Sequence, residues 1–173
     1  MKTKFLWIED NARTDLKHLL APVYMSGEYD PVIAPTVAEG VYQLEHTEFA
    51  AVIVDIRLLP GNNHDWETLY IKLGRERGTA RLGLCLLYSI FDPRPDDVEL
   101  DTIRQRMKDA RYWINAKRFG VLTVEDLDPS RDLGQALTSF GITVSEQKTA
   151  RTPNTTLLGM VRRIVSPQGE AAR

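Results

Sequence analysis

Short runs of apolar residues recur along the first half of the chain, and they predict the strands of a sheet. Residues 4–9 and 50–55 are two such runs, and the second consists mainly of Ala, Val and Ile. An apolar run without polar alternation is typical of a strand buried on both faces, as in a parallel sheet covered by helices. A weaker strand is predicted over residues 29–34, and a fourth over residues 82–91, stopping near Ser89.

Between and after these runs, apolar residues recur at the spacing of amphipathic helices. Thr36 and Glu39 form a capping box, which marks the start of one helix. Gly141 is expected to end another, because glycine readily takes the left-handed conformation at a helix C-terminus. A short strand is predicted over residues 142–144. Besides the helix after Thr36, helices are predicted over residues 12–21, 65–77, 96–118, 131–140 and, capped by Asn154, 154–165.

The alternation of strands and helices favours one α/β domain with a parallel sheet. We expect this domain to span residues 1–166 and to be followed by a flexible tail over residues 167–173. The stretch from about 92 to 129 is longer than an ordinary connection between elements, so it predicts an insertion after the fourth strand.

The composition is that of an ordinary globular protein, with 43% hydrophobic and 27% charged residues. The net charge of −2 gives no electrostatic footprint for nucleic acid. No stretch approaches the roughly 20 apolar residues that span a bilayer, and the single cysteine, Cys85, excludes an internal disulfide. We therefore expect a cytoplasmic protein that binds neither nucleic acid nor membrane.

Acidic residues follow two of the predicted strands. Glu9 and Asp10 come after the first strand, and Asp55 ends the strand over residues 50–55. In open α/β sheets, ligands bind at the carboxyl ends of the strands, so these three carboxylates are site candidates. Like charges at one sheet edge raise one another's pKa unless a cation is present. Mg²⁺, a hard ion that prefers oxygen ligands and retains several waters, suits such a site.

Two further polar residues extend the series, Ser89 near the end of the fourth predicted strand and Lys148 after the short strand over residues 142–144. In this order, the features resemble the receiver domain of two-component response regulators. The resemblance covers nearly the whole chain apart from residues 92–129 and the tail. It implies a flavodoxin-like (βα)5 fold, a five-stranded parallel sheet with helices on both faces.

The resemblance also implies a role for each residue. Glu9 and Asp10 would hold Mg²⁺ together with Asp55 and the backbone carbonyl of Arg57. Asp55 would accept a phosphoryl group from a histidine kinase or a phosphotransfer protein. Ser89 would contact the phosphoryl oxygens, and Lys148 would pair with them; Lys117 competes for the lysine role.

A physical argument supports this set independently, because phosphoryl transfer depends on charge neutralisation and a positioned nucleophile more than on covalent assistance. The leading hypothesis is therefore a stand-alone receiver that signals through a downstream protein target or as a homodimer. We expect no enzymatic activity beyond its own phosphorylation and dephosphorylation.

Three positions depart from the receiver pattern. Ile90 stands where a small residue usually follows the hydroxyl, Ser145 where an aromatic residue precedes the lysine, and Thr149 where a proline follows it. These departures motivate an alternative hypothesis, a pseudo-receiver that serves as an interaction module and is never phosphorylated. A phosphatase with an aspartyl nucleophile is weaker, because Arg57 occupies the position at which such enzymes place a second acid.

Overall fold

Five parallel strands form one sheet in the computed structural model of the chain, which describes residues 2–74, 80–92, 98–107 and 112–166. The sheet has the order β2-β1-β3-β4-β5, and every neighbouring pair is parallel. This arrangement confirms the predicted α/β fold with a five-stranded parallel sheet. The strands are β1 (Thr3–Ile8), β2 (Tyr29–Ala34), β3 (Ala51–Val54), β4 (Phe119–Thr123) and β5 (Val144–Gln147).

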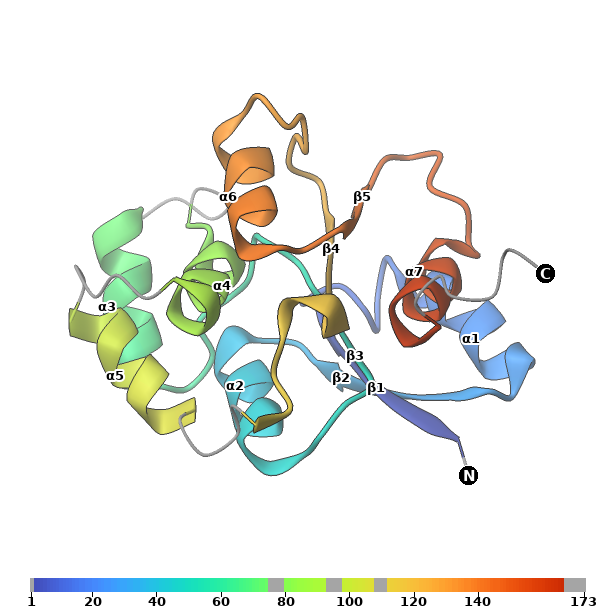
Figure 1. Cartoon of the computed structure of the whole chain (residues 1–173), viewed down its shortest axis with the longest axis horizontal. Coiled ribbons are helices and arrows are strands. Elements are labelled where there is room, and N and C mark those ends of the chain that lie inside the picture. The colour runs from blue at the N-terminus through green and yellow to red at the C-terminus, as the bar shows by residue number, and fades with distance from the viewer. Residues whose placement is uncertain (1, 75–79, 93–97, 108–111, 167–173) are drawn as a thin grey trace.

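Helices cover both faces of the sheet (Figure 1). On one side lie α1 (Leu20–Ser26) and α7 (Thr156–Val165), and on the other lie α2 (Val37–His46), α4 (Leu82–Phe91) and α6 (Asp132–Phe140). Farther from the sheet are α3 (His64–Leu73) and α5 (Val98–Arg106).

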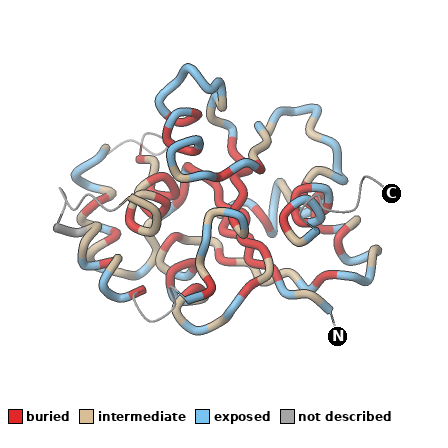
Figure 2. The backbone as a smooth tube through the Cα atoms, viewed as in Figure 1, coloured by how far each residue is buried: buried red, intermediate tan, exposed pale blue. Residues whose placement is uncertain are grey.

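Side chains alternate between the two faces along each strand. Leu6 and Ile8 of β1 join one hydrophobic cluster, whereas Phe5 and Trp7 join the other. The central strands are therefore buried along their length (Figure 2), which explains why their sequences are continuous apolar runs.

The helix-end signals in the sequence differ in their outcomes. Thr36 caps α2 by accepting the backbone N–H of Glu39 at 3.2 Å, and Gly141 ends α6 with a φ of 79°, so both predictions are confirmed. The helix expected over residues 12–21 begins only at Leu20, after a short 3-10 turn. Asn154 does not cap α7, whose N-cap is Thr155.

The fourth strand was predicted in the wrong place. Residues 82–91 form helix α4, and the strand is β4, over residues 119–123, a stretch whose sequence is ambiguous. Helix α4 contacts α2, α3, α5 and α6, so its side chains are buried on several sides. A short helix that is apolar all round has the same composition as a buried strand, and periodicity alone cannot separate the two.

The additional helices consequently lie between β3 and β4, not after β4 as predicted. The long helix expected over residues 96–118 is also wrong: α5 is helical only over Val98–Arg106, and residues 116–118 form the 3-10 turn η3 (Ala116–Arg118). Residues 96–97 and 108–111, which the prediction also included, lie outside the described residues, as does the expected tail over residues 167–173. That residues 1–166 form one domain stays a prediction. Within the described ranges, no helix is both long and apolar enough to cross a membrane.

Candidate functional site

Polar residues gather at the carboxyl edge of the sheet, each directly after or at the end of a strand. The register aligns Ile8 of β1 with Val54 of β3, so the residues that follow them, Glu9 and Asp55, emerge side by side. Thr123 ends β4, and Lys148 follows β5 and donates its backbone N–H to the Thr123 carbonyl at 2.6 Å. Parallel pairing thus brings together four residues that lie far apart in the sequence.

Three carboxylates at this edge are close enough to share one cation. Glu9, Asp10 and Asp55 each offer an oxygen within 4.8 Å of the others. Glu9 is completely buried and Asp55 is only 3% exposed, whereas Asp10 is half-buried. Asp55 Oδ1 accepts the backbone N–H of Ile56 at 2.7 Å, which fixes the orientation of its carboxylate. An oxygen-only set of this kind fits Mg²⁺. The predicted contribution of the Arg57 backbone carbonyl stays a prediction.

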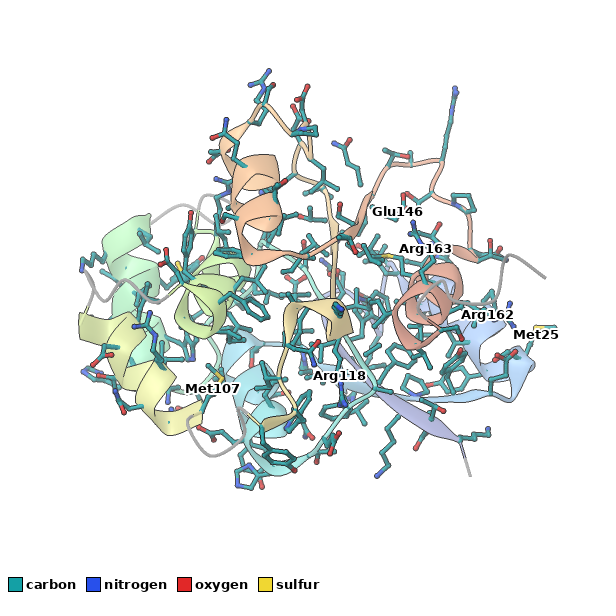
Figure 3. The ribbon with its side chains drawn as sticks, in the orientation of Figure 1. Met25, Met107, Arg118, Glu146, Arg162 and Arg163 are labelled. Carbon is teal, nitrogen blue, oxygen red and sulfur yellow. The ribbon has the colours of Figure 1, made fainter. Side chains whose placement is uncertain are left out.

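Lys148 bridges two of these acids. Its Nζ donates to Asp55 Oδ2 at 2.8 Å and to Glu9 Oε2 at 2.5 Å, and its side chain is 8% exposed. The strand before it is held to α7 by an ion pair between Glu146 and Arg163 at 2.6 Å (Figure 3). Lys117, the competing lysine, lies on η3 before β4 and lines a cavity with Glu48 at the opposite edge of the sheet. Lys148 is therefore the lysine that reaches Asp55.

Burial and mutual repulsion shape the electrostatics of the site. Burial, followed by the nearby Asp55 carboxylate, raises the pKa of Glu9 from 4.5 to about 8, although Lys148 opposes this shift. For Lys148, burial lowers the pKa, but the attraction of Asp55 and Glu9 outweighs it and the net pKa is raised. Lys148 is thus a permanent cation that neutralises only part of the negative charge. The site favours a further positive charge.

Ser89 does not belong to this site. It is buried within α4, where its Oγ donates to the carbonyl of Leu86 at 2.7 Å, the usual local bond of a serine inside a helix. Ile90 lies on the same helix, so it does not follow the hydroxyl at the sheet edge, and its interpretation as a departure from the receiver pattern is wrong. Ser145 and Thr149 keep their places relative to Lys148.

The hydroxyl at the sheet edge belongs instead to Thr123, which the sequence analysis missed. Thr123 is completely buried, and its Oγ1 accepts the backbone N–H of Glu125 at 3.3 Å. A signal for it exists: Phe119 to Leu122 is an apolar run that ends in a hydroxyl residue. The residue after Thr123 is Val124, which is half exposed.

A charged cluster flanks the site on the side of the additional helices. Glu125 accepts from Arg57 Nε at 2.6 Å and from an Arg81 terminal nitrogen at 3.3 Å. The other terminal nitrogen of Arg81 contacts Asp132, at the start of α6, at 2.5 Å. The side chain of Arg57 is therefore engaged away from the carboxylates at the sheet edge.

Several solved structures of receiver domains and response regulators share this fold. A response regulator from Burkholderia pseudomallei, solved with a phosphorylated aspartic acid, a calcium ion and citrate, superposes with a TM-score of 0.54 at 18% identity, covering 95% of this chain and 69% of that chain. A CheY-like receiver domain protein from Methanospirillum hungatei gives 0.55 at 15% identity, covering 95% and 94%. The receiver domain of a sensor histidine kinase from Pseudomonas aeruginosa, with magnesium coordinated in its active-site cleft, gives 0.50 at 13% identity, covering 95% and 98%.

No protein family model matches the sequence, and no curated protein matches it either. The structural similarity nevertheless extends over nearly the whole chain. The chain has the flavodoxin-like fold of CheY-like receiver domains, as the sequence predicted.

Proposed function

We propose that this chain is a receiver protein that accepts a phosphoryl group on Asp55 in a Mg²⁺-dependent reaction. The observation that carries the proposal is the contact of Lys148 Nζ with Asp55 Oδ2 at 2.8 Å, beside the acids Glu9 and Asp10. A buried carboxylate with a lysine and two further acids at a sheet edge is a costly arrangement. It is explained if the site exists to bind a cation and a phosphoryl group.

The chemistry follows from the positions of the side chains. An Asp55 oxygen attacks the phosphorus of a phosphohistidine, a P–O bond forms, and the P–N bond to the histidine breaks. In this reaction, Lys148 and the Thr123 hydroxyl stabilise the negative charge of the transferred oxygens. Mg²⁺, which Glu9, Asp10, Asp55 and the Arg57 carbonyl would hold, would supply the remaining charge neutralisation. The presence of calcium or magnesium in two of the similar structures supports this expectation.

The partners that this function requires are a histidine kinase or phosphotransfer protein as donor and a protein target, or a second copy of the chain, as recipient of the signal. We propose that the protein acts in the cytoplasm. Its catalysis would be limited to its own phosphorylation and dephosphorylation.

The proposal is tested by intact mass spectrometry after incubation with Mg²⁺ and acetyl phosphate. We expect a phosphoryl adduct on the natural protein, and none on Asp55→Asn or in excess EDTA. Asp30→Asn, which alters an exposed aspartate on β2, is the control and should retain the adduct. Loss of the adduct from Asp30→Asn, or an adduct on Asp55→Asn, would refute Asp55 as the acceptor.

The alternative, a pseudo-receiver, rests on departures from the receiver pattern around Thr123 and Lys148. Ile90 no longer supports it, but Val124 now stands where a small residue usually follows the hydroxyl, and Ser145 and Thr149 also still depart from the pattern. Titration with beryllofluoride, observed by NMR, separates the two functions. A receiver should show shifts centred on Asp55, Thr123 and Lys148 that require Mg²⁺, and a pseudo-receiver should show none.

A further inference from the structure

The connection between β3 and β4 begins with a segment that leaves the sheet edge and returns to it. We call residues 57–81 the α3 segment; the structure describes residues 57–74 and 80–81 of it. The segment starts two residues after Asp55, contains α3, and ends immediately before α4. Both of its ends therefore lie near the candidate phosphorylation site.

One carboxylate joins the two ends of this segment. Glu125, on the loop after β4, accepts from Arg57 at the beginning of the segment at 2.6 Å and from Arg81 at its end at 3.3 Å. Glu125 is mostly buried, with 15% of its side chain exposed, and Arg81 is 26% exposed. Arg57 is 45% exposed, so the bond between Arg81 and Glu125 is the more buried of the two, and a charge-assisted hydrogen bond in such a position is stronger than a surface ion pair.

The balance of charge makes Glu125 necessary for this arrangement. Arg57 and Arg81 bring two positive charges to one place, and Glu125 contacts both, while Asp132 contacts Arg81 alone and is 75% exposed. In addition, Arg81 Nε is buried and has no hydrogen-bond partner among the described residues. Without Glu125, the two guanidinium groups would repel each other across the base of the segment.

Glu125 is in turn positioned by the site itself. Its backbone N–H donates to Thr123 Oγ1 at 3.3 Å, and Thr123 is the hydroxyl at the sheet edge beside Asp55 and Lys148. A threonine hydroxyl that rotates toward Asp55 leaves this N–H. We propose that Thr123, acting through Glu125, controls how firmly the α3 segment is held, so that the segment loosens when Thr123 turns toward a phosphoryl group on Asp55.

This inference deepens the proposed function and rests on it for the phosphorylated state, but its first step is testable in the resting protein. Hydrogen exchange, measured by mass spectrometry on peptides that cover α3, reports local opening. We expect Glu125→Gln and Thr123→Val each to accelerate exchange in α3 about tenfold, the change that a loss of roughly 1.4 kcal/mol in local stability gives. The double variant should exchange no faster than either single one.

Matched controls separate this coupling from general damage. Glu48→Gln breaks an Arg–Glu pair of 2.7 Å with Arg118. Arg118, labelled in Figure 3, lies near the opposite edge of the sheet, so this change should leave exchange in α3 unchanged. Thr123→Ser keeps the hydroxyl and should leave exchange in α3 at the rate of the natural protein. If Thr123→Val does not fold, Thr123→Ala takes its place.

Unchanged exchange in Glu125→Gln would overturn the role of Glu125, and additive effects in the double variant would overturn the link to Thr123. A third arm uses the protein treated with acetyl phosphate and Mg²⁺, whose mass is measured first. If the adduct forms and exchange in α3 does not accelerate, the inference fails. If no adduct forms, the proposed function fails, while the resting-state variants still decide whether Thr123 and Glu125 hold the segment.

Discussion

Gly83, in the first turn of α4, packs directly against the backbone of Asp55 and Ile56. A Cβ placed on Gly83 would lie 1.8 Å from the Asp55 carbonyl oxygen and 2.9 Å from both the Asp55 carbonyl carbon and the Ile56 Cα. These are backbone atoms, so no side-chain rotation can relieve the contact. The Gly83 N–H also donates to the Ile56 carbonyl at 3.0 Å. Gly83→Ala must therefore push α4 and the Asp55 strand end apart by more than about 1 Å, since non-bonded carbon contacts lie near 3.5 Å.

We expect this change to reduce the free energy of unfolding by roughly 3 kcal/mol, the upper range for overpacking, with about 1 kcal/mol more if the Gly83 hydrogen bond is lost. The matched control is Gly159→Ala in α7, where a Cβ would meet nothing within 4 Å. Because alanine favours a helix, this control should be stabilised by about 0.5–1 kcal/mol. Gly83 lies in the first turn and Gly159 in a helix interior, so their gains in helix propensity can differ by up to about 1 kcal/mol, and only a larger difference in stability reports the clash. Urea denaturation measures both, and equal stability of the two variants would refute the packing of α4 on Asp55.

Three further predictions concern the site directly. Thr123→Ala should slow phosphorylation by acetyl phosphate about 10-fold or more, as the loss of one charge-stabilising donor does, whereas Ser89→Ala should not. Intact mass spectrometry at timed intervals measures both rates. The reverse result would assign the hydroxyl role to Ser89. Lys148→Met should lower the free energy of unfolding by roughly 3–5 kcal/mol in EDTA, because Glu9 and Asp55 then face each other without a cation. Urea denaturation should show that Mg²⁺ recovers part of this loss. An equal loss with and without Mg²⁺ would contradict a cation site. Burial and Asp55 raise the folded-state pKa of Glu9 from 4.5 to about 8. Between these pH values the folded protein holds a proton that the unfolded chain has released. The free energy of unfolding in EDTA should therefore fall as pH rises from about 5 to 8. Glu9→Gln should flatten this slope, and a slope unchanged in the variant would exclude Glu9 as its source.

Strands could be predicted from the sequence where a short apolar run is followed directly by charged residues. β1 and β3 are apolar runs followed by acids, and together they place Glu9, Asp10 and Asp55 correctly at one edge. Lys148 was also found, because the short β5 precedes it directly.

The error at residues 82–91 arose because burial, not secondary structure, determines apolar content. Helix α4 is surrounded by other helices, so it has no polar face to mark its period. β4 contains Gly120, which weakens a strand pattern, although in the structure a Cβ there would crowd Ile53 and Ile164 at about 3 Å. Because the fourth strand was predicted at residues 82–91, the hydroxyl role was assigned to Ser89 instead of Thr123.

The charges at the sheet edge explain why the phosphoryl acceptor and the cation belong together. With their acids ionised, Glu9, Asp10 and Asp55 carry three negative charges, and Lys148 supplies one positive charge. Converting the Asp55 carboxylate to an acyl phosphate would add about one more negative charge at neutral pH, in a site where Glu9 is already driven toward its protonated form by burial and by Asp55. Lys148 cannot neutralise this addition alone, because it already contacts both Glu9 and Asp55. A divalent cation restores near-neutrality before the reaction and reduces the repulsion after it, so phosphorylation of Asp55 should depend on the cation more strongly than on any single side chain around it.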